Sequence, residues 1–176
     1  MSSIVLIGFM GTGKTAVGRE LAERLGREFV DLDTVIERRE GESVSEIFRR
    51  HGERHFRNLE KKAVAEVSGR RDVILAAGGG AVLDRENVEN LKKMGPLVHL
   101  MARPEAIEKR ISGQHHRPLM EVDDRLRKIE SMLAVRLPFY AFADMDIDTS
   151  ELSIEEVATR IICRLGTLES EESDHG

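Results

Sequence analysis

The chain has 176 residues, of which 40% are hydrophobic and 34% charged, and its formal net charge is -5 at pH 7. This length suits one domain around a single core, and the composition is that of a globular protein rather than a disordered one. The absence of an excess of basic residues argues against nucleic-acid binding as the main task. The single cysteine, Cys163, excludes an intrachain disulfide framework, and we expect it to pack in the core.

The first half of the chain alternates short apolar runs with helical patterns. Ile4 to Ile7 is rich in β-branched residues and is followed by a glycine, which is typical of a buried parallel strand. Ser43 and Glu46 form a capping-box pattern that opens a helix. The predicted strands of this half are 3–7, 28–31 and 73–77, and the predicted helices are 14–25, 43–52 and 53–67.

The second half continues the alternation, and Ser153 with Glu156 repeats the capping box. Here we predict strands over 97–101 and 146–149 and helices over 84–91, from Pro104, over 123–139 and from 154 to 165. Strands alternating with helices indicate an α/β fold, a three-layer sandwich with a parallel sheet covered on both faces. No apolar run reaches the roughly 20 residues of a membrane-spanning helix, and the first residues do not resemble a secretion signal. We therefore expect a cytoplasmic protein.

The segment from Gly8 to Thr15 fits the phosphate-loop pattern G-x-x-x-x-G-K-T, and it lies between a predicted strand and a predicted helix. Glycines allow backbone N–H groups to surround phosphate oxygens, and the helix N-terminus adds partial positive charge. Lys14 is expected to reach the β- and γ-phosphates and the Thr15 hydroxyl to bind Mg²⁺. Because the chain has no N-K-x-D guanine signature, the motif predicts ATP and favours a small-molecule kinase.

Two carboxylates follow the second predicted strand. If the chain stays extended there, Asp31 and Asp33 lie on the same side. One could hold Mg²⁺ through water while the other meets the hydroxyl group of the acceptor. The alternative is that Asp33 only caps the helix that follows it.

Three further features could belong to an acceptor pocket. Gly78-Gly79-Gly80 ends the third predicted strand and would allow a ligand to approach the backbone closely, although a plain turn is the alternative. Arg57 can be braced by Glu60 one helical turn later, or it can lie on a solvated helix face. Arg117 and Arg136 can likewise belong to the pocket or lie on a solvated surface.

Taken together and in order, these motifs resemble the shikimate kinase family over roughly residues 3 to 165. The resemblance rests on Gly8-Phe9-Met10-Gly11-Thr12-Gly13-Lys14-Thr15, Asp31-Leu32-Asp33, Phe56-Arg57-x-x-Glu60, Gly78-Gly79-Gly80, Arg117-Pro118-Leu119 and Arg136-x-Pro138-x-Tyr140. It implies a nucleoside monophosphate kinase-like fold with a five-stranded parallel sheet. It also implies that ATP phosphorylates the 3-hydroxyl of shikimate in the pathway to chorismate and the aromatic amino acids.

The resemblance implies a role for each matched residue. Asp33, Arg57, Gly79 and Arg136 would bind shikimate, the two arginines at its carboxylate and Asp33 at its ring hydroxyls. Lys14, Asp33 and Arg117 would be catalytic, with Arg117 carried toward the phosphates by a lid. Thr15 and, through water, Asp31 would hold Mg²⁺. The expected ATP contacts are Gly11, Thr12, Gly13, Lys14, Thr15, Ala16, Arg117 and Arg110, the last near the adenine.

The resemblance divides the chain into one kinase domain over 1–168, with a substrate-binding subdomain over about 33–62 and a lid over about 112–122. We expect the acidic tail over 169–176 to be disordered and the protein to be a monomer that binds only small molecules, with no nucleic acid and no membrane. His115 and His116 are expected to be solvated loop residues, because no third metal ligand occurs at a usual spacing. The alternatives are another small-molecule kinase, such as a gluconate kinase, and a non-catalytic nucleotide-binding module.

Overall fold

The protein folds around one parallel sheet. The computed structural model describes residues 2–112 and 124–173, with the backbone alone from 168 onward, and within them five strands pair in the order β2-β3-β1-β4-β5. The strands are β1 Ile4–Ile7, β2 Glu28–Asp31, β3 Val73–Ala76, β4 Leu97–Met101 and β5 Met145–Asp148. The predicted parallel sheet and its α/β class are therefore confirmed.

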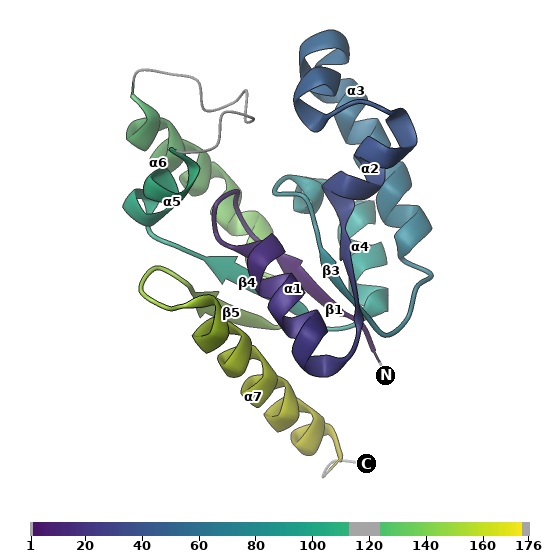
Figure 1. Cartoon of the computed structure of the whole chain (residues 1–176), viewed down its shortest axis with the longest axis vertical. Coiled ribbons are helices and arrows are strands. Elements are labelled where there is room, and N and C mark those ends of the chain that lie inside the picture. Colours follow the sequence, from purple (N-terminus) through teal and green to yellow (C-terminus); the bar gives the residue numbers. More distant parts are fainter. Residues whose placement is uncertain (1, 113–123, 174–176) are drawn as a thin grey trace.

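Helices cover both faces of the sheet (Figure 1). The α-helices of the described residues are α1 Lys14–Leu25, α2 Leu32–Glu40, α3 Val44–Val67, α4 Arg85–Met94, α5 Pro104–Ile111, α6 Arg125–Arg136 and α7 Ile154–Ser173, and the short 3-10 helices are η1 Ala81–Leu83 and η3 Leu137–Tyr140. Several predicted starts are confirmed: both capping boxes form, Asp84 caps α4, and Pro104 opens α5.

The alternation of side chains along β1 explains the three layers. Ile4 and Leu6 pack with α1 and α7, whereas Val5 and Ile7 pack with α3 and α4 on the opposite face. A third cluster joins Phe9 and Met10 of the phosphate loop to Ile107 and Ile111 of α5 and to α6. The loop is thus anchored to the core by its own apolar side chains.

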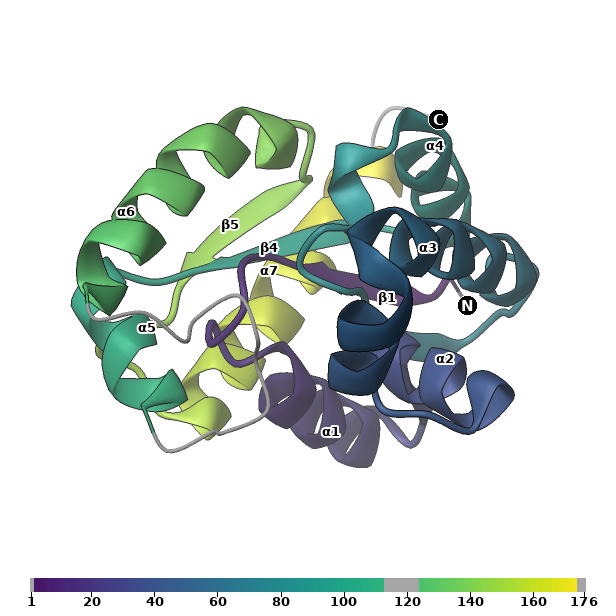
Figure 2. The ribbon, with the colours of Figure 1, turned by 90° about the horizontal axis from the view of Figure 1, so that it is seen from above.

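Two pairs of helices flank the phosphate loop at the carboxyl ends of the strands. In Figures 1 and 2, α2 with the start of α3 lies on one side of the loop, and α5 with α6 lies on the other. The α3 helix is kinked at Gly52, whose φ of 79° and ψ of 170° are not helical. This kink is the break that the sequence predicts between the helices over 43–52 and 53–67.

Two expectations about the C-terminal region differ from the structure. Cys163 is exposed, so the prediction that it packs in the core is wrong. Val157, Ala158 and Ile161 form the buried stripe of α7, and a residue two positions beyond Ile161 points to the opposite face. The helix also continues to Ser173, into the segment expected to be disordered, because Leu and Glu are good helix formers.

Across residues 2–112 and 124–173, no helix combines the length and the apolar character that crossing a membrane requires.

Candidate functional site: a phosphate loop beside a pocket of arginines and glycines

The phosphate loop connects β1 to the N-terminus of α1, as its motif predicts. Gly11 and Gly13 have φ angles of 75° and 99°, a region that L-residues rarely adopt, so only glycine suits these turns. The Lys14 ammonium donates hydrogen bonds to the carbonyl oxygens of Gly8 and Phe9, each at 2.8 Å. The loop therefore presents the positive helix N-terminus and a lysine at one place, which suits a polyphosphate.

Asp31 joins the phosphate loop to α2. One of its carboxylate oxygens accepts a 2.9 Å hydrogen bond from the Thr15 hydroxyl, and the other accepts from the backbone N–H groups of Asp33 and Thr34 at 3.0 and 3.4 Å. Asp31, not Asp33, is thus the helix cap. The expected extended arrangement of the two carboxylates does not form, because α2 already begins at Leu32.

Asp33 instead lies on the first turn of α2 and meets the glycine run. A Cβ placed on Gly78 would collide with the Glu60 Oε1 atom and would lie 3.2 Å from the Asp33 Oδ1 atom. Both carboxylates therefore converge on the end of β3, where only a hydrogen fits. This geometry supports the close-approach interpretation of the glycine run over a plain turn.

Arg57 packs against the same run of glycines, and two glutamates of its own helix hold its guanidinium in place. Its guanidinium donates to Glu60 at 2.8 Å and to Glu53 at 3.1 Å, and a Cβ on Gly80 would collide with it. Glu60 is only 1% exposed, and burial raises its pKa, against the opposing effect of the Arg57 charge. Within the described residues its Oε1 atom has no hydrogen-bond partner. Arg57 thus lies on a buried carboxylate rather than on a solvated helix face.

Arg136 reaches the run from the other side. It is 7% exposed, lies over the Phe9 ring with its guanidinium carbon 5.3 Å from the ring centroid, and donates to the Gly79 carbonyl at 3.4 Å. The Tyr140 hydroxyl donates to the same carbonyl at 3.1 Å. The structure therefore brings Asp33, Arg57, Gly79 and Arg136 together, although they come from four separate segments.

Arg110 lies on the α5 side of the phosphate loop. It donates to the Gly11 carbonyl at 3.3 Å and to the Thr149 hydroxyl at 3.0 Å. The Thr149 side chain is buried and its hydroxyl lies 3.0 Å from the Thr12 carbonyl. Arg110 thus connects the phosphate loop to the segment after β5. Arg117, His115, His116 and most of the expected lid lie outside the described residues.

Known proteins share this architecture and sequence. The family model for shikimate kinase matches residues 10–166. This chain belongs to the shikimate kinase family. The shikimate kinase of Caldanaerobacter subterraneus is 48% identical over 162 residues, covering 92% of this chain and 95% of its own, and that of Geobacter metallireducens is 46% identical over 159 residues, covering 90% and 89%.

Solved structures extend the family comparison. The shikimate kinase of Acinetobacter baumannii in complex with shikimate superposes with a TM-score of 0.91 at 38% identity, covering 95% of this chain and 94% of that one. A gluconokinase of Sinorhizobium meliloti reaches a TM-score of 0.64 at 18% identity over 99% and 97% of the two chains, which shows a shared fold alone. The family assignment therefore favours shikimate kinase over the gluconate kinase alternative.

Several residues around this family site have no role in the sequence-based interpretation. Tyr140 is part of the Arg136-x-Pro138-x-Tyr140 motif, which was its only signal. Thr149, which connects Arg110 to the loop, carries no signal, because its partners lie far away in the sequence. The His99 ring forms a hydrogen bond with Asp146 and stacks on Tyr140, and no local sequence pattern predicts these contacts.

The close packing of Arg57 against Gly80 leads to a testable prediction. Gly80→Ala is expected to displace the guanidinium and to weaken shikimate binding about tenfold, since the added methyl group collides with Arg57. Isothermal titration calorimetry measures the affinity. Gly69→Ala is the matched control, because a Cβ there meets nothing within 4 Å. Unchanged affinity in Gly80→Ala would mean that the position of Arg57 does not matter for binding.

Proposed function

We propose that this shikimate kinase family member transfers the γ-phosphoryl group of ATP to the 3-hydroxyl of shikimate, giving shikimate 3-phosphate and ADP on the way to chorismate. The observation that carries the proposal is the convergence of Arg57, Arg136 and Asp33 on Gly78-Gly79-Gly80, next to the phosphate loop. Two guanidinium groups suit one planar carboxylate, and a neighbouring carboxylate suits ring hydroxyls. We further propose that the protein acts as a cytoplasmic monomer.

Each site residue has a chemical task in this proposal. Arg57 and Arg136 bind the carboxylate of shikimate, and the Gly79 backbone lies against the ring. Asp33 orients the acceptor hydroxyl for in-line attack. Lys14 stabilises the charge that develops on the transferred phosphoryl group, because phosphoryl transfer depends mainly on positioning and electrostatics. Gly11, Thr12, Gly13, Thr15 and Ala16 surround the phosphates with backbone N–H groups.

Two residues, one at the start of α1 and one at the end of β2, fit Mg²⁺. The Thr15 hydroxyl and the Asp31 carboxylate lie 2.9 Å apart, and both are the oxygen ligands that Mg²⁺ prefers. Thr15 would bind the ion directly and Asp31 through water, and the ion would neutralise phosphate charge. We further propose that Arg110 lies near the adenine and that Arg117 approaches the phosphates from the lid.

A coupled ADP-release assay tests the proposed function. We expect turnover with ATP and shikimate and little turnover with gluconate or nucleoside monophosphates, because neither of these alternatives offers a carboxylated ring to Arg57 and Arg136. Turnover with gluconate instead would favour another small-molecule kinase. Nucleotide binding without turnover on any acceptor would favour a non-catalytic module.

Tyr140 supplies a finer prediction within this function. Burial raises the pKa of its hydroxyl to about 12, so the group stays protonated and keeps donating to Gly79 at neutral pH. Tyr140→Phe removes this hydrogen bond and is expected to raise the KM for shikimate about fivefold, while kcat and the KM for ATP change little. Steady-state kinetics measure the three parameters. An equal change in both KM values would contradict a role at Gly79.

A further inference from the structure

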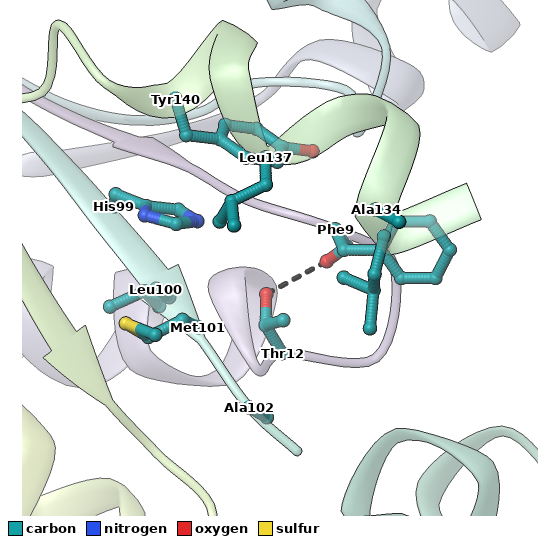
Figure 3. Close-up of a pocket in the computed structure, with 10 residues that line it drawn as sticks. Phe9, Thr12, His99, Leu100, Met101, Ala102, Ala134, Leu137 and Tyr140 are labelled. Atoms are coloured by element: carbon teal, nitrogen blue, oxygen red, sulfur yellow. Dashed lines mark hydrogen bonds between the residues drawn. The ribbon is translucent and has the colours of Figure 1, made fainter. Parts of the chain in front are cut away.

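A cavity of about 210 Å³ lies behind the phosphate loop, between β4, α6 and η3 (Figure 3). Its walls come mainly from apolar side chains, and Phe9 and Thr12 of the loop contribute one side. None of Asp33, Arg57 and Lys14 lines it. The cavity is therefore separate from the side chains proposed to bind shikimate and from Lys14, although it shares Phe9 and Thr12 of the phosphate loop with the nucleotide site.

One polar atom is directed into this cavity. The His99 Nδ1 atom lies 2.7 Å from a carboxylate oxygen of Asp146. Since a carboxylate only accepts, Nδ1 carries the proton, and the other ring nitrogen of the neutral imidazole is an acceptor. Burial lowers the pKa of His99, which favours this neutral form. In Figure 3 that second nitrogen, Nε2, points toward Leu137 and the space beside it.

The hydroxyl groups of Thr12 and Tyr140 also belong to the wall, and each already donates its proton to a backbone carbonyl. The Thr12 hydroxyl donates to the Phe9 carbonyl at 2.8 Å, and the Tyr140 hydroxyl donates to Gly79 at 3.1 Å. Within the described part of the chain, the Nε2 atom of His99 has no protein partner. The Nε2 atom of His99 is thus an acceptor without a partner in a mainly apolar wall, beside hydroxyl oxygens that already take part in hydrogen bonds.

We propose that this cavity is a binding site for a small neutral aromatic molecule that carries one hydrogen-bond donor, such as a phenol. An apolar cavity of about 150 Å³ can hold benzene, so the larger volume here accommodates one substituted ring. The ring contacts the apolar wall, including the edge of Phe9, and its donor reaches Nε2 of His99. Because the occupant touches the loop from behind, it is compatible with simultaneous binding of nucleotide and shikimate.

The test compares phenol with toluene, which has a similar shape and no donor. Ligand-observed NMR titrations use the full chain, with and without ADP and shikimate. We expect phenol to bind in the millimolar range and between about two and ten times more tightly than toluene, which is the usual contribution of one hydrogen bond. His99→Phe keeps the stacking on Tyr140 and removes the acceptor. Phenol should then bind no more tightly than toluene, because its buried hydroxyl loses its partner.

A second variant tests the location. Ala134 is exposed and lines the cavity, so Ala134→Phe is expected to fill it and to weaken the binding of both probes at least tenfold. Val135→Phe is the matched control, because Val135 is 69% exposed and does not line the cavity. Thermal unfolding of each variant shows whether it folds.

Three results would overturn the proposal. Phenol and toluene could bind the original chain equally, which would exclude recognition by His99. Phenol binding could be lost on adding shikimate or ADP, which would place the probe in the substrate sites. Ala134→Phe and Val135→Phe could bind phenol alike while both remain folded, which would place the probe elsewhere on the protein.

Discussion

Replacing Lys14 with alanine is expected to lower kcat about 10³-fold and to leave the protein folded. The side chain belongs to no apolar cluster, and its ammonium donates to the carbonyls of Gly8 and Phe9 within the loop. Its proposed contribution is positive charge at the phosphoryl group in the transition state, which neither water nor the loop backbone can replace. Coupled ADP release with ATP and shikimate gives kcat, and thermal unfolding reports the fold.

A matched control separates this effect from a general loss of charge. Lys62→Ala removes an exposed lysine on α3, and its kcat should equal that of the original protein. If Lys14→Ala keeps most of its activity, the assignment of Lys14 to the transition state is wrong. If the variant unfolds, the loop depends on the lysine for its structure.

Replacing Arg57 with alanine is expected to weaken shikimate binding about 100-fold, because the proposed charge-assisted pair with the substrate carboxylate is lost. The same change should also destabilise the protein by about 3 kcal/mol, since it leaves the carboxylate of Glu60 buried without its partner. Calorimetry gives the affinity, and urea unfolding gives the free energy of unfolding. ATP affinity should change far less.

A double variant distinguishes the two effects. In Arg57→Ala/Glu60→Gln the buried charge is gone, so most of the stability should return while shikimate affinity stays low. Arg136→Ala should weaken shikimate binding to a similar extent, because its guanidinium lies on the other side of Gly79. Recovery of shikimate affinity in the double variant would show that Arg57 acts only through stability.

The parts of the fold that local patterns control were predictable. The β-branched run of β1, the capping boxes at Ser43 and Ser153 and the break at Gly52 all depend on neighbouring residues, and the structure agrees with each of them. The phosphate loop was predictable for the same reason, since its spacing alone determines its geometry. These predictions were sufficient to place the candidate site at the carboxyl ends of the strands.

Contacts between distant segments were not predictable in this way. The spacing of Arg57 and Glu60 suggests a pair, but not that Glu60 is almost fully buried or that both side chains pack on glycines of another strand. The interpretation of Asp31 and Asp33 assumed an extended chain, whereas Asp31 caps α2 with its own carboxylate. Burial and capping choice depend on the packed structure, so sequence spacing leaves them open.

The two oxygens of Asp31 imply that the two substrates assist each other. One oxygen accepts from Thr15 of the phosphate loop, and the other holds the first turn of α2, which carries Asp33. A nucleotide that fixes Thr15 thereby restricts the end of the helix that is proposed to meet the acceptor. Thermodynamic linkage is reciprocal, so any gain in shikimate affinity caused by nucleotide must equal the gain in nucleotide affinity caused by shikimate. We therefore expect positive heterotropic cooperativity, transmitted by one carboxylate.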